Sequence, residues 1–164
     1  MKVIELADGE TARRWDECVQ GAPEATVYQL AGWKRVMERT FGHKAHYLMV
    51  MEGGDALGVL PLLHIKSSLA GHYVTSPSGG ICCRDEQAAT ALLERAKELV
   101  TKTKAKYLIL RDSRHRWDLP GLVTSEDHCT FVGKLCPAPS QLWSQLDRRV
   151  RQQRPGCRTR GRPG

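Results

Sequence analysis

The chain has 164 residues, of which 41% are hydrophobic and 26% are charged, and it carries a formal net charge of +7. These proportions are ordinary for one globular domain with a real core, and no apolar run approaches the roughly 20 residues of a membrane-spanning helix. The first residues carry one lysine and then turn acidic without an apolar stretch, so no signal peptide is expected and the predicted location is cytoplasmic.

The first half of the chain predicts two helices followed by a hairpin. A strand is expected at 2–6, and helices at 11–20 and 29–40 carry apolar stripes at three- and four-residue spacing. Strands 46–52 and 56–67 flank Gly53 and Gly54, which are turn residues, so they predict a β-hairpin. The apolar stripes of the two helices comprise Ala12, Trp15 and Val19, and then Leu30, Trp33, Met37 and Phe41.

The second half of the chain is predicted to contain three strands and two helices. Strands are expected at 72–76, 107–110 and 129–135, and helices at 85–104 and 140–153. Asp85 is placed to cap the first of these helices. Because hairpins and helices are mixed, the predicted fold class is α/β (α+β), with a mixed twisted β-sheet flanked by helices.

The positive charge is concentrated at the carboxyl end. Residues 148–164 contain seven arginines and no acid, which leaves 18 basic and 18 acidic residues in 1–147. The pI of about 9.3 would by itself suggest a nucleic-acid or membrane partner. The distribution instead describes a neutral domain with a basic end.

The cysteines and histidines do not form a recognisable metal motif. Six cysteines are present without a C-x-x-C pair, so reduced thiols are the preferred interpretation, with metal or redox chemistry as the alternative. Neither H-E-x-x-H nor G-x-S-x-G occurs, and no catalytic residue is assigned. Trp15, Trp33 and Trp143 are expected in cores rather than on a base-stacking surface, and the role of Trp117 is open.

The segment from Ser76 to Gly80 is the best candidate for a binding loop. It lies between a strand and a helix, where open sheets often bind ligands, and its two glycines allow backbone N–H groups to approach an anion. We predict Ser76, Gly79 and Gly80 as substrate-binding residues, with Arg111 at the end of a neighbouring strand. The alternatives are a simple turn for the loop, and a solvated Arg111–Asp112 pair at a strand exit.

A collinear series of segments resembles one known family. It begins at residues 33–43 and 47–48, and continues through Gly58, Pro61, Ser76-Pro77 and Gly79-Gly80 to Tyr107–Arg111, 130–132 and 142–151. Together these segments resemble the FemAB-like family of peptidoglycan-bridge and exopolysaccharide-associated proteins, in particular its exosortase (PEP-CTERM) branch. The resemblance covers about residues 1–153 and rests on the series rather than on any single motif.

The resemblance implies two tandem GNAT-like acyltransferase halves, of which 1–153 would be the first. It implies transfer of an aminoacyl or acyl group from aminoacyl-tRNA or acyl-CoA to an amine of a cell-envelope precursor. Positioning and oxyanion donors would drive such a reaction without a covalent nucleophile or a resident cofactor. Family members place an aromatic residue and a tyrosine before the paired glycines, where this chain has only Ser78.

The end of the chain departs from the family pattern. Residues 154–164 are rich in Arg, Gly and Pro, and Pro155 and Gly156 would stop a helix. We expect this tail to be disordered, and we hypothesise that the reading frame shifts near Arg154, leaving a truncated first half. Three functions therefore stay open: an acyltransferase half, a non-catalytic binding module or inactive fragment, and nucleic-acid binding by the tail.

Overall fold

The computed structural model describes residues 1–67, 71–112, 117–125, 138–146 and 148. The chain divides into two units, Met1–His128 and Cys129–Gly164, which are described separately. The strand predicted at 129–135, the helical residues 149–153 and the tail 154–164 lie outside the described residues.

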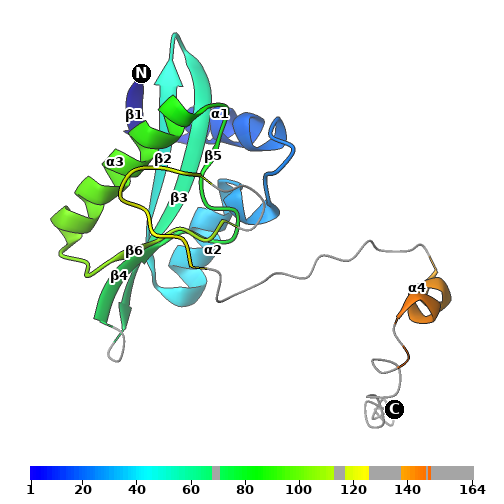
Figure 1. Cartoon of the computed structure of the whole chain (residues 1–164). Helices are drawn as coiled ribbons and strands as arrows, with labels where there is room; N and C mark the ends of the chain where they lie inside the picture. Colours follow the sequence, from blue (N-terminus) through cyan, green and yellow to red (C-terminus); the bar gives the residue numbers. More distant parts are fainter. Residues whose placement is uncertain (68–70, 113–116, 126–137, 147, 149–164) are drawn as a thin grey trace. The chain divides into compact units, whose positions relative to one another are not determined.

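The first unit is built around a mixed, twisted sheet with the strand order β1-β2-β3-β4-β6 (Figure 1). Strands β1 to β4 pair antiparallel, β5 pairs with β3, and β4 pairs with β6 in parallel. The predicted fold class is therefore confirmed. The strands are β1 (Lys2–Glu5), β2 (Lys44–Glu52), β3 (Asp55–Ser67), β4 (Gly71–Thr75), β5 (Cys82–Cys83) and β6 (Leu108–Ile109).

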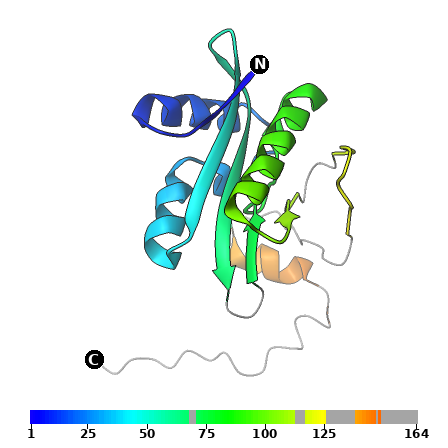
Figure 2. The same cartoon turned by 90° about the vertical axis from the view of Figure 1, so that its left-hand side faces the viewer.

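Helices cover both faces of this sheet, as Figure 2 shows. Helices α1 (Gly9–Gln20) and α2 (Gly32–Phe41) lie on one face, and α3 (Glu86–Thr103) lies on the other. Each face has its own apolar cluster because side chains alternate along a strand. One cluster packs Tyr47 and Met49 of β2 with Trp15 of α1, and the other packs Leu48 and Val50 with α3.

Helix α1 begins two residues earlier than its apolar stripe indicated. The Asp8 side chain accepts a hydrogen bond from the Thr11 backbone N–H at 2.9 Å and caps the first turn. Trp15 and Val19 are buried as predicted, and the indole N–H of Trp15 donates to the Gln29 carbonyl at 2.7 Å. Trp15 therefore ties α1 to the segment that precedes α2.

The second helix begins later than predicted. Residues Val27–Gln29 form a short 3-10 helix, η1, and the extended backbone of Leu30 separates it from α2. The predicted apolar stripe is only partly correct, because Leu30 and Met37 pack against the core while Phe41 is 58% exposed. Trp33 is half-buried, with its ring 5.2 Å from that of Tyr28.

The predicted hairpin is confirmed. Glu52 pairs with Asp55 across Gly53 and Gly54, both of which have positive φ angles (60° and 98°), as tight two-residue hairpin turns require. Pro61 lies inside β3, between the stretch bonded to β4 and the stretch bonded to β5. It pairs with Tyr47 of β2, and as a proline it has no N–H to donate to the ladder.

Helix α3 agrees with the sequence prediction almost to the residue. Asp85 accepts a hydrogen bond from the Ala88 N–H at 2.7 Å, and the predicted apolar positions Ala88, Leu92, Ala96 and Leu99 are all buried. Trp117, whose role was open, packs against this same cluster. The short strand β5 was not predicted.

The described part of the second unit contains α4 (Pro139–Gln145), which ends at Leu146 in extended backbone. The predicted helix continued to 153; Arg148 is again helical, and residues 147 and 149–153 lie outside the described residues. Trp143 is 43% exposed, and its predicted core position is not observed in this part of the chain.

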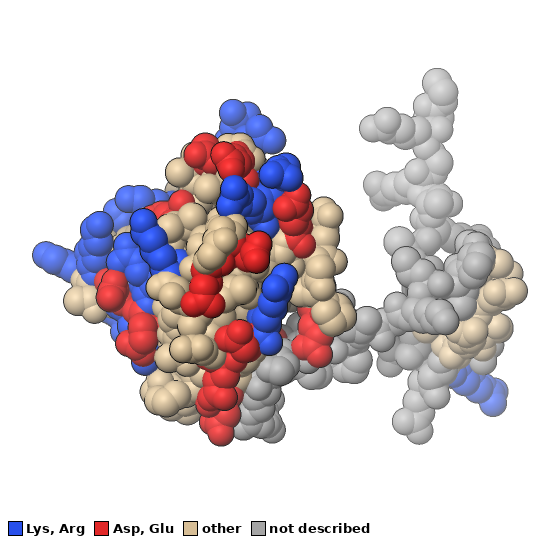
Figure 3. Space-filling view, turned by 90° about the horizontal axis from the view of Figure 1, so that it is seen from above, with Lys and Arg blue, Asp and Glu red and all other residues tan. Residues whose placement is uncertain are grey.

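Two further observations concern the surface charge and the hydropathy of the described residues. Basic and acidic side chains are interspersed on the face seen in Figure 3, in keeping with the neutral count for residues 1–147. No helix in the described part of the chain is long and apolar enough to cross a membrane.

Candidate functional site

The four predicted site residues meet where β4 and β6 end. These two strands are parallel, with Val74 opposite Leu108 and Thr75 opposite Ile109. Their carboxyl ends therefore lie at the same edge of the sheet, the usual location of binding sites in open sheets. Loop 76–80 follows β4 and Arg111 follows β6, so the structure brings Ser76, Gly79, Gly80 and Arg111 together.

Hydrogen bonds join the two strand exits into one unit. The Arg111 N–H donates to the Ser76 hydroxyl oxygen at 2.8 Å, and the Gly79 N–H donates to the Arg111 carbonyl at 2.9 Å. The Ser76 N–H donates to the Ile109 carbonyl at 2.9 Å. Ser76 is 1% exposed, whereas the Arg111 side chain is exposed, so the bonds fix the Arg111 backbone and leave its side chain at the surface.

The two glycines are required by the shape of the loop. Gly79 and Gly80 have φ angles of 114° and 55°, which side-chain-bearing residues rarely adopt. A β-carbon on Gly79 would lie 2.6 Å from the Gln29 side chain. A β-carbon on Gly80 would lie 3.1 Å from that of Asp112. Close approach by other side chains thus adds to the backbone requirement.

Gln29 holds the loop from the other side. Its side-chain amide donates to the carbonyls of Gly79 and Gly80, each at 3.2 Å, and its carbonyl oxygen accepts the Thr26 N–H at 2.7 Å. The Thr26 hydroxyl donates to the Ser78 carbonyl at 2.7 Å. Gln29 is fully buried, so these bonds replace the water that its amide would otherwise bind.

The sequence prediction assigned no role to Gln29 or Thr26. A usable signal was present, because T-x-x-Q is a capping-box pattern in which the glutamine reaches back to the threonine N–H. The predicted helix at 29–40 obscured it by placing Gln29 inside a helix rather than at the end of η1. The contact between η1 and loop 76–80 spans about 50 positions, and local patterns do not report such a distance.

The loop's backbone donors are largely engaged within the protein. The Gly79 N–H bonds to Arg111 and the Gly80 N–H bonds to the Pro77 carbonyl at 3.4 Å. The alternative interpretation of this segment, a structural turn, describes these bonds well. What faces outward at this edge is the Arg111 side chain, a cation beside a rigid loop.

The strand that follows the loop carries two thiols with little nucleophilic character. Burial raises the pKa of the Cys82 thiol to about 11 and that of the Cys83 thiol to about 12. Thiols with such pKa values are protonated at neutral pH, and the thiolate is the reactive form. Among the described residues no group of three or more His, Cys, Asp or Glu side chains is arranged to hold a metal ion.

The fold is shared with FemX and with acetyltransferases. The structure of FemX matches 64% of this chain with a TM-score of 0.53 and 26% sequence identity. A ribosomal-protein-alanine N-acetyltransferase from Brucella melitensis matches 82% of the chain with a TM-score of 0.54 and 13% identity. The aminoglycoside 6'-N-acetyltransferase AAC(6')-IG from Acinetobacter haemolyticus matches 83% of it with a TM-score of 0.54 and 15% identity.

The extent of these matches differs. The matched region spans a quarter of the FemX chain, but all of each acetyltransferase chain. No family model and no curated protein sequence matches this chain. The comparisons establish a GNAT-like acyltransferase fold, as the resemblance implied.

Proposed function

We propose that this chain is a FemAB-like acyl- or aminoacyl-transferase half-domain that acts on an amine of a cell-envelope precursor. The observation that carries the proposal is the joined exit of β4 and β6, formed on a fold shared with FemX and with acetyltransferases. In the FemAB-like family that the sequence resembles, the donor is aminoacyl-tRNA; for the GNAT-like fold it is acyl-CoA.

Ser76, Gly79, Gly80 and Arg111 are the substrate-binding residues in this proposal. The Arg111 guanidinium offers a fork of N–H donors to a phosphate of the donor or of the acceptor. Its backbone is held on both sides by loop 76–80, so the cation is presented from a rigid base. Such positioning is the main contribution a protein can make when the attacking amine and the activated carbonyl supply the chemistry.

The reaction itself requires an amine to attack the donor carbonyl and the tRNA hydroxyl or the CoA thiol to leave with a proton. Donors aimed at the developing oxyanion would lower the barrier. The N–H groups of Gly79 and Gly80 are committed inside the loop, so in this proposal the loop shapes the site and another group supplies the oxyanion donor.

A non-catalytic binding module is the second candidate function. It is favoured by the same internal hydrogen bonds of Gly79 and Gly80, because a loop that keeps its donors satisfied can hold a ligand without stabilising a transition state.

The test uses the full chain with acetyl-CoA and, separately, with charged tRNA, each with a peptidoglycan precursor as the acceptor. Mass spectrometry of the acceptor measures transfer, and isothermal titration calorimetry measures donor binding. Transfer that falls at least tenfold in Arg111→Gln, but not in the surface variant Arg39→Gln, supports the transferase. Saturable binding without transfer supports the binding module, and the absence of both contradicts the proposal.

A further inference from the structure

A second polar region borders the apolar cluster between the sheet and α3. Here β2 begins, β3 ends and α3 reaches its last turns, and together they enclose a cavity of about 580 Å³. Loop 76–80 and Arg111 do not line this cavity. It is therefore separate from the site described above.

The side chains of β2 and β3 that line this cavity become stepwise more polar along each strand. Alternate residues of a strand share a face. On the α3 face, β2 runs from Leu48 to His46 to Lys44, and β3 runs from Leu62 to His64 to Lys66. Lys44 pairs with His64 and His46 pairs with Leu62, so the two gradients lie side by side. Both strands change from aliphatic to imidazole to ammonium in the same direction.

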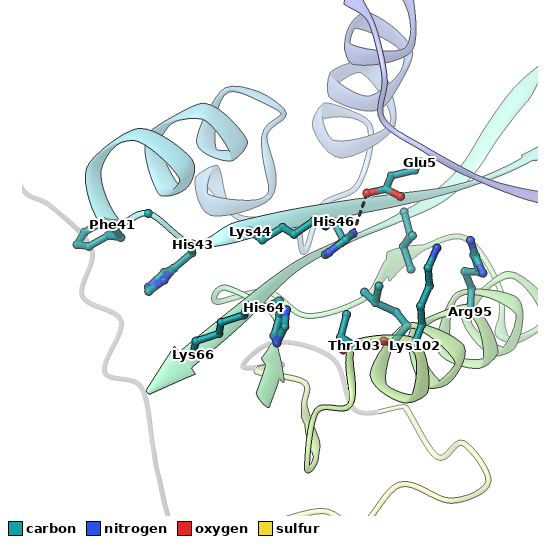
Figure 4. A pocket seen from close by; sticks show the side chains of 13 residues that line it. Glu5, Phe41, His43, Lys44, His46, His64, Lys66, Arg95, Lys102 and Thr103 are labelled. Atoms are coloured by element: carbon teal, nitrogen blue, oxygen red, sulfur yellow. Dashed lines mark hydrogen bonds and ion pairs between the residues drawn. The ribbon is translucent and has the colours of Figure 1, made fainter. Parts of the chain in front are cut away.

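Two imidazole nitrogens inside this region have no hydrogen-bond partner. His46 is 8% exposed and His64 is 6% exposed. The Nε2 atom of each is buried and unpartnered among the described residues. Buried polar atoms are nearly always paired, so two adjacent exceptions in one cavity point to a missing partner. Figure 4 shows both rings on the side of the strands that faces Lys102 and Thr103 of α3.

The charge around these two nitrogens is predominantly positive. Lys44, Lys66, Lys102 and Arg95 line the cavity, and Glu5 is the one acid among its described lining residues. Arg95 is paired with Glu98 at 2.6 Å, so the three lysines carry the excess charge. This environment disfavours a bound metal cation and favours an anion.

The two histidines differ in their surroundings. The His46 Nδ1 lies 2.9 Å from the Glu5 carboxylate oxygen, which accepts a hydrogen bond from it. Burial first, and then Lys66, His72, His46 and Lys44, lower the pKa of His64. The other charged groups that line the cavity are Glu5 from β1 and Arg95 and Lys102 from α3.

We propose that this cavity binds a phosphorylated small molecule or oligophosphate, held by Lys44, Lys66 and Lys102 and by the Nε2 N–H groups of His46 and His64. The volume exceeds what one phosphate ion fills and suits a ligand that carries several phosphoryl oxygens. Oligophosphates carry several charges and many acceptor oxygens, which match three ammonium groups and two imidazole donors. The inference does not depend on the proposed transferase function.

The experiment titrates the full chain with inorganic tripolyphosphate and follows the imidazole resonances of its histidines by NMR. This readout distinguishes the cavity from the arginine-rich residues 148–164, which attract any polyanion. We expect saturable shifts of the His46 and His64 signals. We also expect tighter binding as the pH falls from about 7.5 to about 6, because binding takes up protons.

Two matched double variants distinguish binding in the cavity from nonspecific attraction to the positive charge of the protein. Lys44→Gln/Lys66→Gln removes two exposed cavity lysines, and Lys2→Gln/Arg35→Gln removes two exposed charges elsewhere. We expect the first pair to weaken binding about five- to tenfold and the second pair less than twofold. Equal losses in the two double variants would overturn the proposal, as would a titration in which the His46 and His64 signals do not shift. Citrate binding as tightly as tripolyphosphate would overturn the assignment to phosphates.

Discussion

Loop 76–80 and the basic cavity on the α3 face satisfy their polar groups in opposite ways. At the carboxyl end of β4, loop 76–80 donates its glycine N–H groups to Arg111 and Pro77, and Gln29 binds its carbonyls. On the α3 face of β2 and β3, the cavity beside His46 and His64 leaves two buried nitrogens without partners among the described residues. A closed hydrogen-bond network indicates a rigid scaffold, whereas buried unpaired donors or acceptors indicate a place for a ligand.

This difference distinguishes two interpretations of a glycine-rich loop. From sequence, paired glycines indicate either a backbone that approaches a ligand or a backbone that must turn. Here the positive φ angles and the contact with Gln29 account for the glycines at positions 79 and 80 without any ligand. The four predictions below test each half of the comparison.

The largest effect is expected at Gly79. Replacing Gly79 by Ala places a β-carbon 2.6 Å from Gln29 in a backbone with a φ of 114°. We expect a loss of about 3 kcal/mol or more in the free energy of unfolding, measured by urea denaturation. Gly54→Ala is the matched control, because its φ of 98° is similar and no atom lies within 4 Å of the added carbon. Its expected loss is about 1–2 kcal/mol, and equal losses would show that the Gln29 contact contributes nothing.

Gln29→Ala tests the other half of the same contact. The change leaves the carbonyls of Gly79 and Gly80 and the Thr26 N–H without their buried partner. We expect a loss of about 2–3 kcal/mol in the free energy of unfolding. Gln87→Ala, at an exposed position of α3, should change stability by less than about 0.5 kcal/mol. A Gln29→Ala protein as stable as the Gln87→Ala protein would contradict a loop held by Gln29.

At the cavity, His64 is predicted to make the stability of the protein depend on pH. Its pKa is lowered in the folded state, mainly by burial, so the unfolded chain binds more protons in the acidic range. The stability contributed by neutral His64 is present above about pH 6.5 and is lost as the pH falls through its folded pKa. We expect His64→Gln to flatten this loss between pH 7 and pH 5, measured by urea denaturation at each pH. A slope unchanged from that of the parent protein would show that His64 is not the responsible group.

The smallest signal is expected at the thiols beside the loop. With pKa values of about 11 and 12, Cys82 and Cys83 should resist alkylation by iodoacetamide at pH 7.5 in the folded protein. In urea both should react at the rate of an ordinary thiol, as peptide mass spectrometry would measure. Rapid labelling of either cysteine without denaturant would mean that the region next to loop 76–80 opens readily. That result would contradict the closed hydrogen-bond network at the carboxyl end of β4.

Much of the fold could be predicted because local patterns determine it. The Gly53-Gly54 turn, the Asp85 cap and the apolar face of α3 each depend on residues close together in sequence. The predicted start of α2 was wrong because its apolar spacing extends back to Leu30, whose extended backbone separates η1 from α2. The two-residue β5 forms only through its pairing with β3, which short windows do not reveal.

The candidate sites could be predicted only in part. Ser76, Gly79, Gly80 and Arg111 were found from their place after strands, and the structure brings them together. The basic cavity was not found, because Lys44 and His64 become neighbours through strand pairing and Lys102 joins them through the packing of α3. His43 and His46 are close in sequence, but nothing in their spacing indicates the burial of His46.

Hydrogen exchange measured by mass spectrometry on the full chain, with acetyl-CoA and with tripolyphosphate, tests most directly whether loop 76–80 and the basic cavity bind different ligands. The account predicts that acetyl-CoA slows exchange in peptides from 76–83 and 107–112, and that tripolyphosphate slows it in peptides from 42–48 and 62–67. Protection of the same peptides by both ligands, or protection confined to 148–164, would contradict it.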